Sequence, residues 1–109
     1  MPVTIKIPST LKVGSHTYKV LLDEREDDGN FGGSALHRQR ELLLNPATNN
    51  QDMHVTYIHE ALHILARAYC INLEEDVVSS LGEALTAFLV NTLGIKFDFS
   101  NLPTRKVRK

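Results

Sequence analysis

The chain has 109 residues, 42% of them apolar, and a formal net charge of −1. This length predicts one domain, residues 1–102, followed by a short basic end at 103–109 that we expect to be disordered. The charge gives no strong attraction to nucleic acid, and no stretch is long and apolar enough to span a membrane. The lack of a signal-peptide core and the single cysteine, Cys70, predict a cytoplasmic protein without an internal disulfide.

The first half of the chain predicts a small twisted sheet. The sequence indicates strands at five places: 3–7, where apolar and polar residues alternate, and 11–13, 16–22, 33–37 and 42–45. Gly14-Ser15 suits a tight hairpin turn between the second and third of these strands. The acidic stretch that follows, residues 23–30, is typical of a solvated loop.

An amphipathic helix is expected next. Thr48 and Gln51 have the spacing of a capping box, and five apolar residues recur at helical intervals: Val55, Ile58, Leu62, Leu65 and Tyr69. We expect this stripe to face the core. The adjacent side of the helix, which carries His59 and His63, would then remain available to a ligand.

The pentapeptide His59-Glu60-Ala61-Leu62-His63 has the spacing of a zinc site. Residues four apart stack on one face of a helix, so the two imidazoles converge on one point. Glu60, one step round, could reach a water molecule held there. A catalytic zinc site needs a third protein ligand and leaves its fourth position to water.

A second helix is predicted over 74–89, with an apolar side that we expect to face the core: Val77, Val78, Leu81, Leu85, Phe88 and Leu89. The short connection makes the two helices neighbours, so an acidic residue of the second should lie near the histidines. A strictly antiparallel pair favours Glu83. Glu75 stacks under Gly82, where space is free, but it could instead cap the helix together with Asn72. Glu74 is the third candidate.

Together the HExxH motif and the run Glu75-Asp76-Val77-Val78-Ser79-Ser80-Leu81-Gly82-Glu83-Ala84-Leu85 resemble a known family. The chain is similar to small metallopeptidase-like proteins of phages and prophages, which are relatives of the zincin-like peptidases that cleave phage-type repressors. The resemblance implies an α+β, minimal zincin-like domain: a small amino-terminal sheet, the HExxH helix and a second packed helix. It also implies that Glu75 is the third ligand, and that strand 33–37 is an open edge for an extended peptide.

The resulting hypothesis is a zinc metallopeptidase that acts on a protein or peptide. His59, His63 and Glu75 would bind Zn²⁺, and Glu60 would act as general base toward the water. Mn, Fe, Co and Ni can occupy such ligands as well. One alternative is a zinc-stabilised module that binds a phage or host regulator without catalysis, although the presence of Glu60 favours catalysis. Another is a helical docking surface whose histidines bind no metal.

The other candidate residues are interpreted as structural. Three histidines, His16, His37 and His54, lie outside the motif, where a lone histidine is usually a surface or core residue. His37 could stabilise a reaction oxyanion if its strand borders the cleft. Cys70 lies about 10 Å along the helix from His63, which is too far to share an ion, so we expect it to pack near the helix end. Gly94 should end the second helix, before a short extended segment at 95–99.

Overall fold

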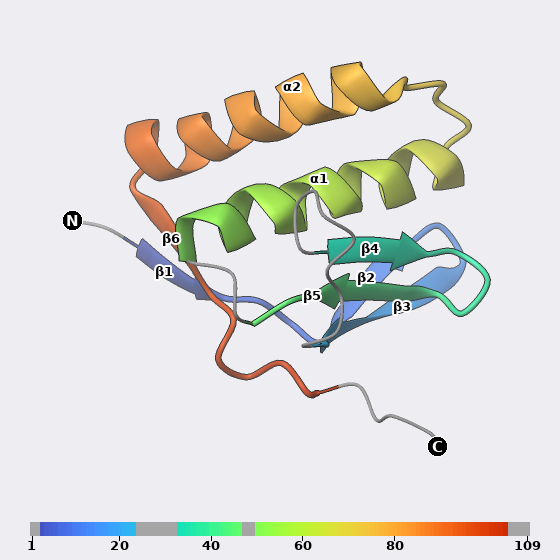
Figure 1. Cartoon of the computed structure of the whole chain (residues 1–109), viewed down its shortest axis with the longest axis horizontal. Coiled ribbons are helices and arrows are strands. Elements are labelled where there is room, and N and C mark those ends of the chain that lie inside the picture. The colour runs from blue at the N-terminus through green and yellow to red at the C-terminus, as the bar shows by residue number, and fades with distance from the viewer. Residues whose placement is uncertain (1–2, 24–32, 47–49, 105–109) are drawn as a thin grey trace.

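The computed structural model describes residues 3–23, 33–46 and 50–104 (Figure 1). This part of the chain folds as a mixed α+β domain, as predicted. Its elements in chain order are β1 (Val3–Lys6), β2 (Thr10–Val13), β3 (His16–Leu22), β4 (Gly33–Leu36), β5 (Glu41–Leu44), α1 (Asn50–Ala68), α2 (Glu75–Ala87), the π-helical turn η1 (Phe88–Thr92) and β6 (Ile95–Asp98). The predicted cap residue Thr48, the acidic stretch from residue 24 on and the basic end from residue 105 on lie outside the described residues.

The main sheet has the strand order β2-β3-β5-β4. β2 and β3 form the predicted antiparallel hairpin, and Gly14 in its turn has φ +56°, a left-handed conformation that favours glycine. β3 pairs in parallel with β5, and β5 pairs antiparallel with β4. The strand β4 therefore lies at one edge of this sheet.

A second, two-stranded sheet joins the beginning of the described chain to its end. β1 pairs in parallel with β6, so that Val3 lies opposite Ile95 and Lys6 opposite Asp98. The chain then returns to the main sheet, where the Leu22 N–H donates a hydrogen bond of 2.8 Å to the Pro103 carbonyl. These pairings connect residues about 80–90 positions apart, which local sequence patterns do not encode.

The molecule has three layers, with α1 between the main sheet and α2 (Figure 1). Most of the core lies where strands and α1 meet, and its largest fully buried apolar side chains are Val13, Val20, Leu42, Leu43, Leu44, Ile64 and Val78. A Cβ at Gly33 would lie 2.5 Å from the Thr56 Cγ2 and 2.8 Å from the Leu43 carbonyl oxygen. Because no side chain fits there, α1 packs directly on β4.

The predicted core side of α1 is partly wrong. Leu65 and Tyr69 are 37% and 59% exposed, whereas Ile64 is fully buried against the sheet. Val55, Ile58 and Leu62 are half-buried. The reason is that α1 is covered on two opposite sides, by the sheet and by α2, and the predicted stripe lies on the flank between them.

The predicted core side of α2 is also wrong, because this helix lies in the outer layer. Only Val78, Gly82 and Thr86 of α2 are buried. Four of the six apolar residues predicted for the core are exposed: Val77, Leu81, Leu85 and Phe88. A helix that packs on a single neighbour covers only one narrow strip of its surface, and here that strip contains two small residues.

The end of α1 directs the chain back toward its start. Cys70 has φ +57°, and the Ile71 N–H donates to the Ala66 carbonyl at 2.8 Å, as in a Schellman motif. Cys70 is exposed, so the expectation that it packs near the helix end is wrong. The short connection makes α1 and α2 antiparallel neighbours. None of the helices in the described ranges has both the length and the apolar content needed to cross a bilayer.

Candidate metal centre

Both histidines of the HExxH motif face α2. His59 and His63 are one turn apart on α1, so their side chains leave the helix on the same side. α2 crosses His59 at Gly82, where an added Cβ would lie 3.5 Å from the His59 Cα. The small residue lets the two backbones come close, and the imidazoles therefore lie between the helices.

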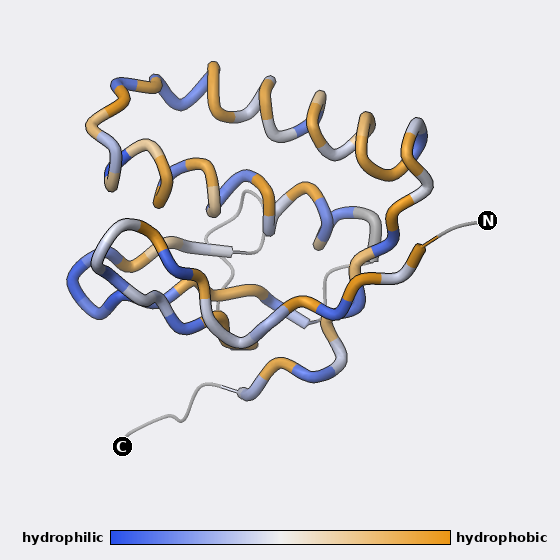
Figure 2. The backbone as a smooth tube through the Cα atoms, turned by 180° about the vertical axis from the view of Figure 1, so that it is seen from behind, coloured by the Kyte–Doolittle hydropathy of each residue, from blue (hydrophilic) through white to orange (hydrophobic). Residues whose placement is uncertain are grey.

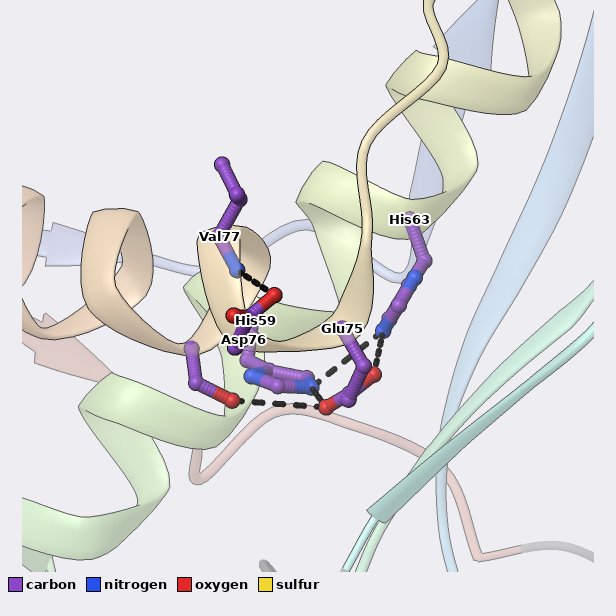
Figure 3. Close-up of polar contacts among 6 residues, drawn as sticks. His59, His63, Glu75, Asp76 and Val77 are labelled. Carbon is purple, nitrogen blue, oxygen red and sulfur yellow. Dashed lines mark hydrogen bonds and ion pairs between the residues drawn. The ribbon is translucent and has the colours of Figure 1, made fainter.

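Glu75, the first residue of α2, reaches both imidazoles (Figure 3). Its Oε2 lies 3.0 Å from the His59 Nε2, and its Oε1 lies 2.9 Å from the His63 Nε2. The two Nε2 atoms are 3.3 Å apart. The Ser79 hydroxyl, one turn further along α2, donates a hydrogen bond of 3.3 Å to the Glu75 Oε2 and steadies the carboxylate. Two nitrogens and one carboxylate thus converge from two helices.

The three side chains form a group that could hold a metal ion. In the part of the chain that the structure describes, His59, His63 and Glu75 make up such a group, with ligand atoms within 4.8 Å of one another. Two ligands about 2.0–2.1 Å from a tetrahedral zinc ion lie about 3.3 Å apart. The observed separations of 2.9, 3.0 and 3.3 Å are close to this spacing. The donor set fits zinc with only small changes in side-chain torsion.

Burial differs between the three groups. The side chain of His59 is 3% exposed, that of His63 is 29% exposed and that of Glu75 is 63% exposed. Burial lowers the pKa of His59 below its ordinary value of 6.5, and the charge of His63 lowers it further, although the charge and hydrogen bond of Glu75 oppose the shift. A neutral imidazole keeps the lone pair that a metal needs. The buried His59 therefore favours the neutral form that can bind a metal, whereas Glu75 on the outside of the group is open to solvent.

The other two glutamates proposed as ligands do not join this group. Glu74 is the N-cap residue of α2. Glu83 is exposed and lines a groove with Thr86 and Val90. It follows the residue that faces His59, so it lies nearly level with the imidazole but about 100° round the helix from it. Glu83 therefore lies at the right level along α2 to be a ligand, but its side chain leaves the helix in a direction away from the imidazoles.

The capping role considered for Glu75 is not what the structure shows. α2 begins after Glu74 and not after Asn72, and the Glu74 side chain makes no capping hydrogen bond. Within the first turn, the Asp76 Oδ1 accepts a hydrogen bond of 3.0 Å from the neighbouring Val77 N–H (Figure 3). The carboxylate of Glu75 thus points to the histidines.

Glu60, the predicted general base, is only 7% exposed. It follows His59 on α1 and lies about 100° round the helix from it, on the side of Thr56, which packs on β4. Glu60 therefore lies buried next to two imidazoles that could bind a metal, on the side of α1 that faces β4.

His37 lies just beyond the end of β4, where the sequence placed a possible oxyanion contact. Its Nδ1 is 3.0 Å from the hydroxyl of the buried Tyr18. Burial lowers the pKa of His37, and the charges of Arg67 and His63 lower it further. Tyr18 and Arg67 were not singled out from the sequence, because only the fold brings them near His37. Ser79 was also missed, although its spacing of four residues from Glu75 on one helix could have indicated the contact.

The remaining histidines are structural, as expected. His54 is buried, and its Nε2 accepts a hydrogen bond of 2.8 Å from the Phe97 N–H. Its ring stacks on that of Phe97 with a centroid distance of 4.9 Å. His16 is exposed at the start of β3. Neither contributes to the metal-binding group.

Comparisons with protein-family models, curated proteins and solved structures find no match to this chain. The resemblance to phage-type metallopeptidases therefore stays an expectation from the sequence. Any assignment of chemistry has to be carried by the geometry of the three converging side chains.

Proposed function

We propose that this protein is a zinc-dependent peptidase of the HExxH type. His59, His63 and Glu75 hold Zn²⁺, and Glu60 is the general base. The observation that carries the proposal is the convergence of two imidazole nitrogens and a carboxylate at separations of 2.9–3.3 Å. The resemblance to zincin-like peptidases supports the choice of reaction.

The number and type of ligands favour a catalytic ion. Closed structural zinc sites use four protein ligands, usually with cysteine, whereas catalytic sites use three and leave one position open. The group here contains three residues among those described, and its outer member, Glu75, is largely exposed. Fe, Mn, Co and Ni accept the same donors, so zinc is chosen for its tetrahedral geometry and three-ligand habit.

The chemistry divides between the ion and the chain. When bound, zinc lowers the pKa of a water molecule in its open position and polarises the carbonyl of the scissile peptide bond. The Glu60 carboxylate accepts the proton of the attacking water and later donates it to the leaving amine. His59 and His63 act as neutral ligands, and Ser79 holds one oxygen of Glu75 in place.

A peptide substrate is supported by the edge of the main sheet. Among the described strands, β4 pairs only with β5 and is an edge strand, the position at which an extended peptide would add to the sheet. Because α1 packs on β4 at Thr56, a peptide paired with this edge would run beside the helix that carries the histidines. A peptide substrate whose backbone is bound by strand pairing needs no deep pocket for its side chains.

The test replaces the proposed base and leaves the ligands intact. Glu60→Gln should retain about one zinc per chain by native mass spectrometry and lose cleavage of a susceptible peptide from a broad library, by a factor of at least about 100. Glu83→Gln is the matched control, because it makes the same chemical change in an exposed glutamate and should cleave like the wild type. Full activity in Glu60→Gln would contradict the assigned role.

A second candidate is a zinc-stabilised binding module without catalysis. The observation in its favour is that the ion would join α1 to α2, whose other contact with α1 is a narrow strip at Val78, Gly82 and Thr86. The same experiment separates the two. A wild type that binds zinc but cleaves no peptide in the library supports the module.

A further inference from the structure

α2 has an apolar flank that no described residue covers. Relative to Gly82, which faces α1, the exposed residues Leu81 and Leu85 lie about 60–100° to one side, and Glu83 lies about 100° to the other. Val77 and Phe88 extend the same flank by one turn in each direction. Four large apolar side chains thus follow one another along the helix.

α1 continues this surface. Relative to His59, the exposed Leu65 lies about 120° to one side, whereas Glu60 and His63 lie on the other. The exposed Tyr69 follows the last residue of α1 on the same side as Leu65, and its hydroxyl accepts a hydrogen bond of 3.3 Å from the Gly14 N–H. In two antiparallel helices, residues rotated in the same direction away from the contact between the helices lie on the same side of the pair. The exposed residues of both helices therefore share one face. We call this face the apolar flank; it consists of Leu65, Tyr69, Val77, Leu81, Leu85 and Phe88. In the view of Figure 2, most of α2 beyond its first turn is apolar or neutral.

The apolar flank carries almost no charge. Between Val77 and Ile95, Glu83 is the only charged residue, and it points to the opposite side. Glu74, the N-cap residue of α2, borders one end of the flank. Apart from Glu74 at one end, a charged partner would find no charge on the flank to pair with, and the partner that fits is itself apolar and nearly uncharged.

The size of the surface matches a second copy of the chain. Six side chains of this type with 37–59% exposure leave roughly 500 Å² of contiguous surface, at the upper end of what monomers show. Two such faces together would bury about 1,000 Å², the area that a specific interface needs. The net charge of −1 adds little repulsion between copies.

We propose that the protein forms a twofold-symmetric dimer through the apolar flank. In this dimer two copies of α2 lie antiparallel, with the symmetry axis between Leu81 and Leu85. Leu81 then contacts Leu85 of the partner subunit, and Val77 contacts Phe88 of the partner subunit. Glu74 lies beside Asn91 and Thr92 of the partner subunit, which carry no charge.

The dimer leaves the candidate metal centre open. His63 and Glu60 lie on the opposite flank of α1, toward β4, so neither the ligands nor the sheet edge is covered. Association therefore goes beyond the proposed peptidase activity and does not require it. A chain that binds no zinc can still dimerise.

The test measures the mass of the full-length chain by sedimentation velocity over a dilution series. Wild type should be a dimer, and Leu81→Glu should raise the dissociation constant at least about 100-fold because it buries two unpaired carboxylates. Ser80→Glu adds the same charge one residue away, outside the flank, and should remain a dimer. Both positions are exposed, and circular dichroism checks that each variant folds.

A mixing experiment tests the proposed register. Leu85→Lys should also be monomeric on its own. When Leu81→Glu and Leu85→Lys are mixed, one carboxylate faces one ammonium group and the two remaining leucines face each other, so a heterodimer should form. A monomeric wild type, a dimeric Leu81→Glu variant, or a mixture that stays monomeric would each overturn the proposal.

Discussion

The two helices of this domain are held in different ways. α1 is covered by the sheet and by α2, and it contributes Met53 and Ile64 to the core. α2 is buried only at Val78, Gly82 and Thr86. Two of the three candidate metal ligands therefore come from a firmly packed helix and the third from a loosely packed one. A bound ion would connect them at the end where α2 begins.

The sharpest test of this difference compares two neighbouring residues of α1. Ile64 is fully buried and Leu65 is 37% exposed. Ile64→Ala should lower the free energy of unfolding by about 2–5 kcal/mol, because it removes core contacts and leaves a cavity. Leu65→Ala should lower it by less than about 1 kcal/mol. Urea unfolding at low protein concentration measures both, and similar losses would mean that the core face of α1 is misassigned.

The contact between the helices can be probed at Gly82. A Cβ there would lie 3.5 Å from the His59 Cα, which is ordinary van der Waals contact. Gly82→Ala should therefore raise the free energy of unfolding by about 0.5–1 kcal/mol, since glycine is unfavourable inside a helix.

Gly82→Leu provides the opposite case at the same position. Its larger side chain has to push α2 away from His59, so it should lower stability by about 1–3 kcal/mol and weaken zinc binding. Thermal unfolding of the metal-free variants, followed by zinc titration, tests both substitutions. A destabilised Gly82→Ala would show that the helices are closer than described.

The smallest expected effect concerns pH. His59 has a lowered pKa because it is buried, whereas in the unfolded chain it binds a proton near its ordinary value of 6.5. Below that pH the unfolded state holds more protons, so the stability of the metal-free protein should fall as pH drops from about 6.5. Urea unfolding between pH 7 and pH 5 measures the slope. In His59→Gln the slope should decrease, and an unchanged slope would contradict the shift.

Local sequence patterns predicted the elements well. The hairpin strand β3 has the expected bounds, 16–22, and α2 begins one residue later than expected. The patterns could not predict the parallel pairings of β1 with β6 and of β3 with β5, because these depend on the packing of distant segments. The apolar stripes were misassigned for a related reason. An apolar stripe shows which face of a helix is hydrophobic but not what covers that face. On α2 the apolar residues form a flank that no described residue covers.

At the candidate site, too, positions within one helix could be predicted from the sequence, whereas contacts between two helices could not. The spacing of His59 and His63 predicts that the imidazoles converge, since a single helix determines their positions. The third group depends on how two helices cross. The antiparallel arrangement alone favoured Glu83, but the direction of each side chain brings Glu75 to the histidines. The support of His37 by Tyr18 involves two segments of the sheet and could not be read from either.

The most direct test of the metal centre is a zinc titration of three proteins: wild type, Glu75→Ala and Glu83→Ala. Wild type should bind about one zinc per chain. Loss of a second-shell partner typically weakens metal binding 10–100-fold, so Glu75→Ala should weaken it more than about 100-fold, while Glu83→Ala should bind like wild type. Unfolding without metal provides the control for stability. Loss of zinc in Glu83→Ala alone, or a wild type that binds no zinc after reconstitution, would contradict the account.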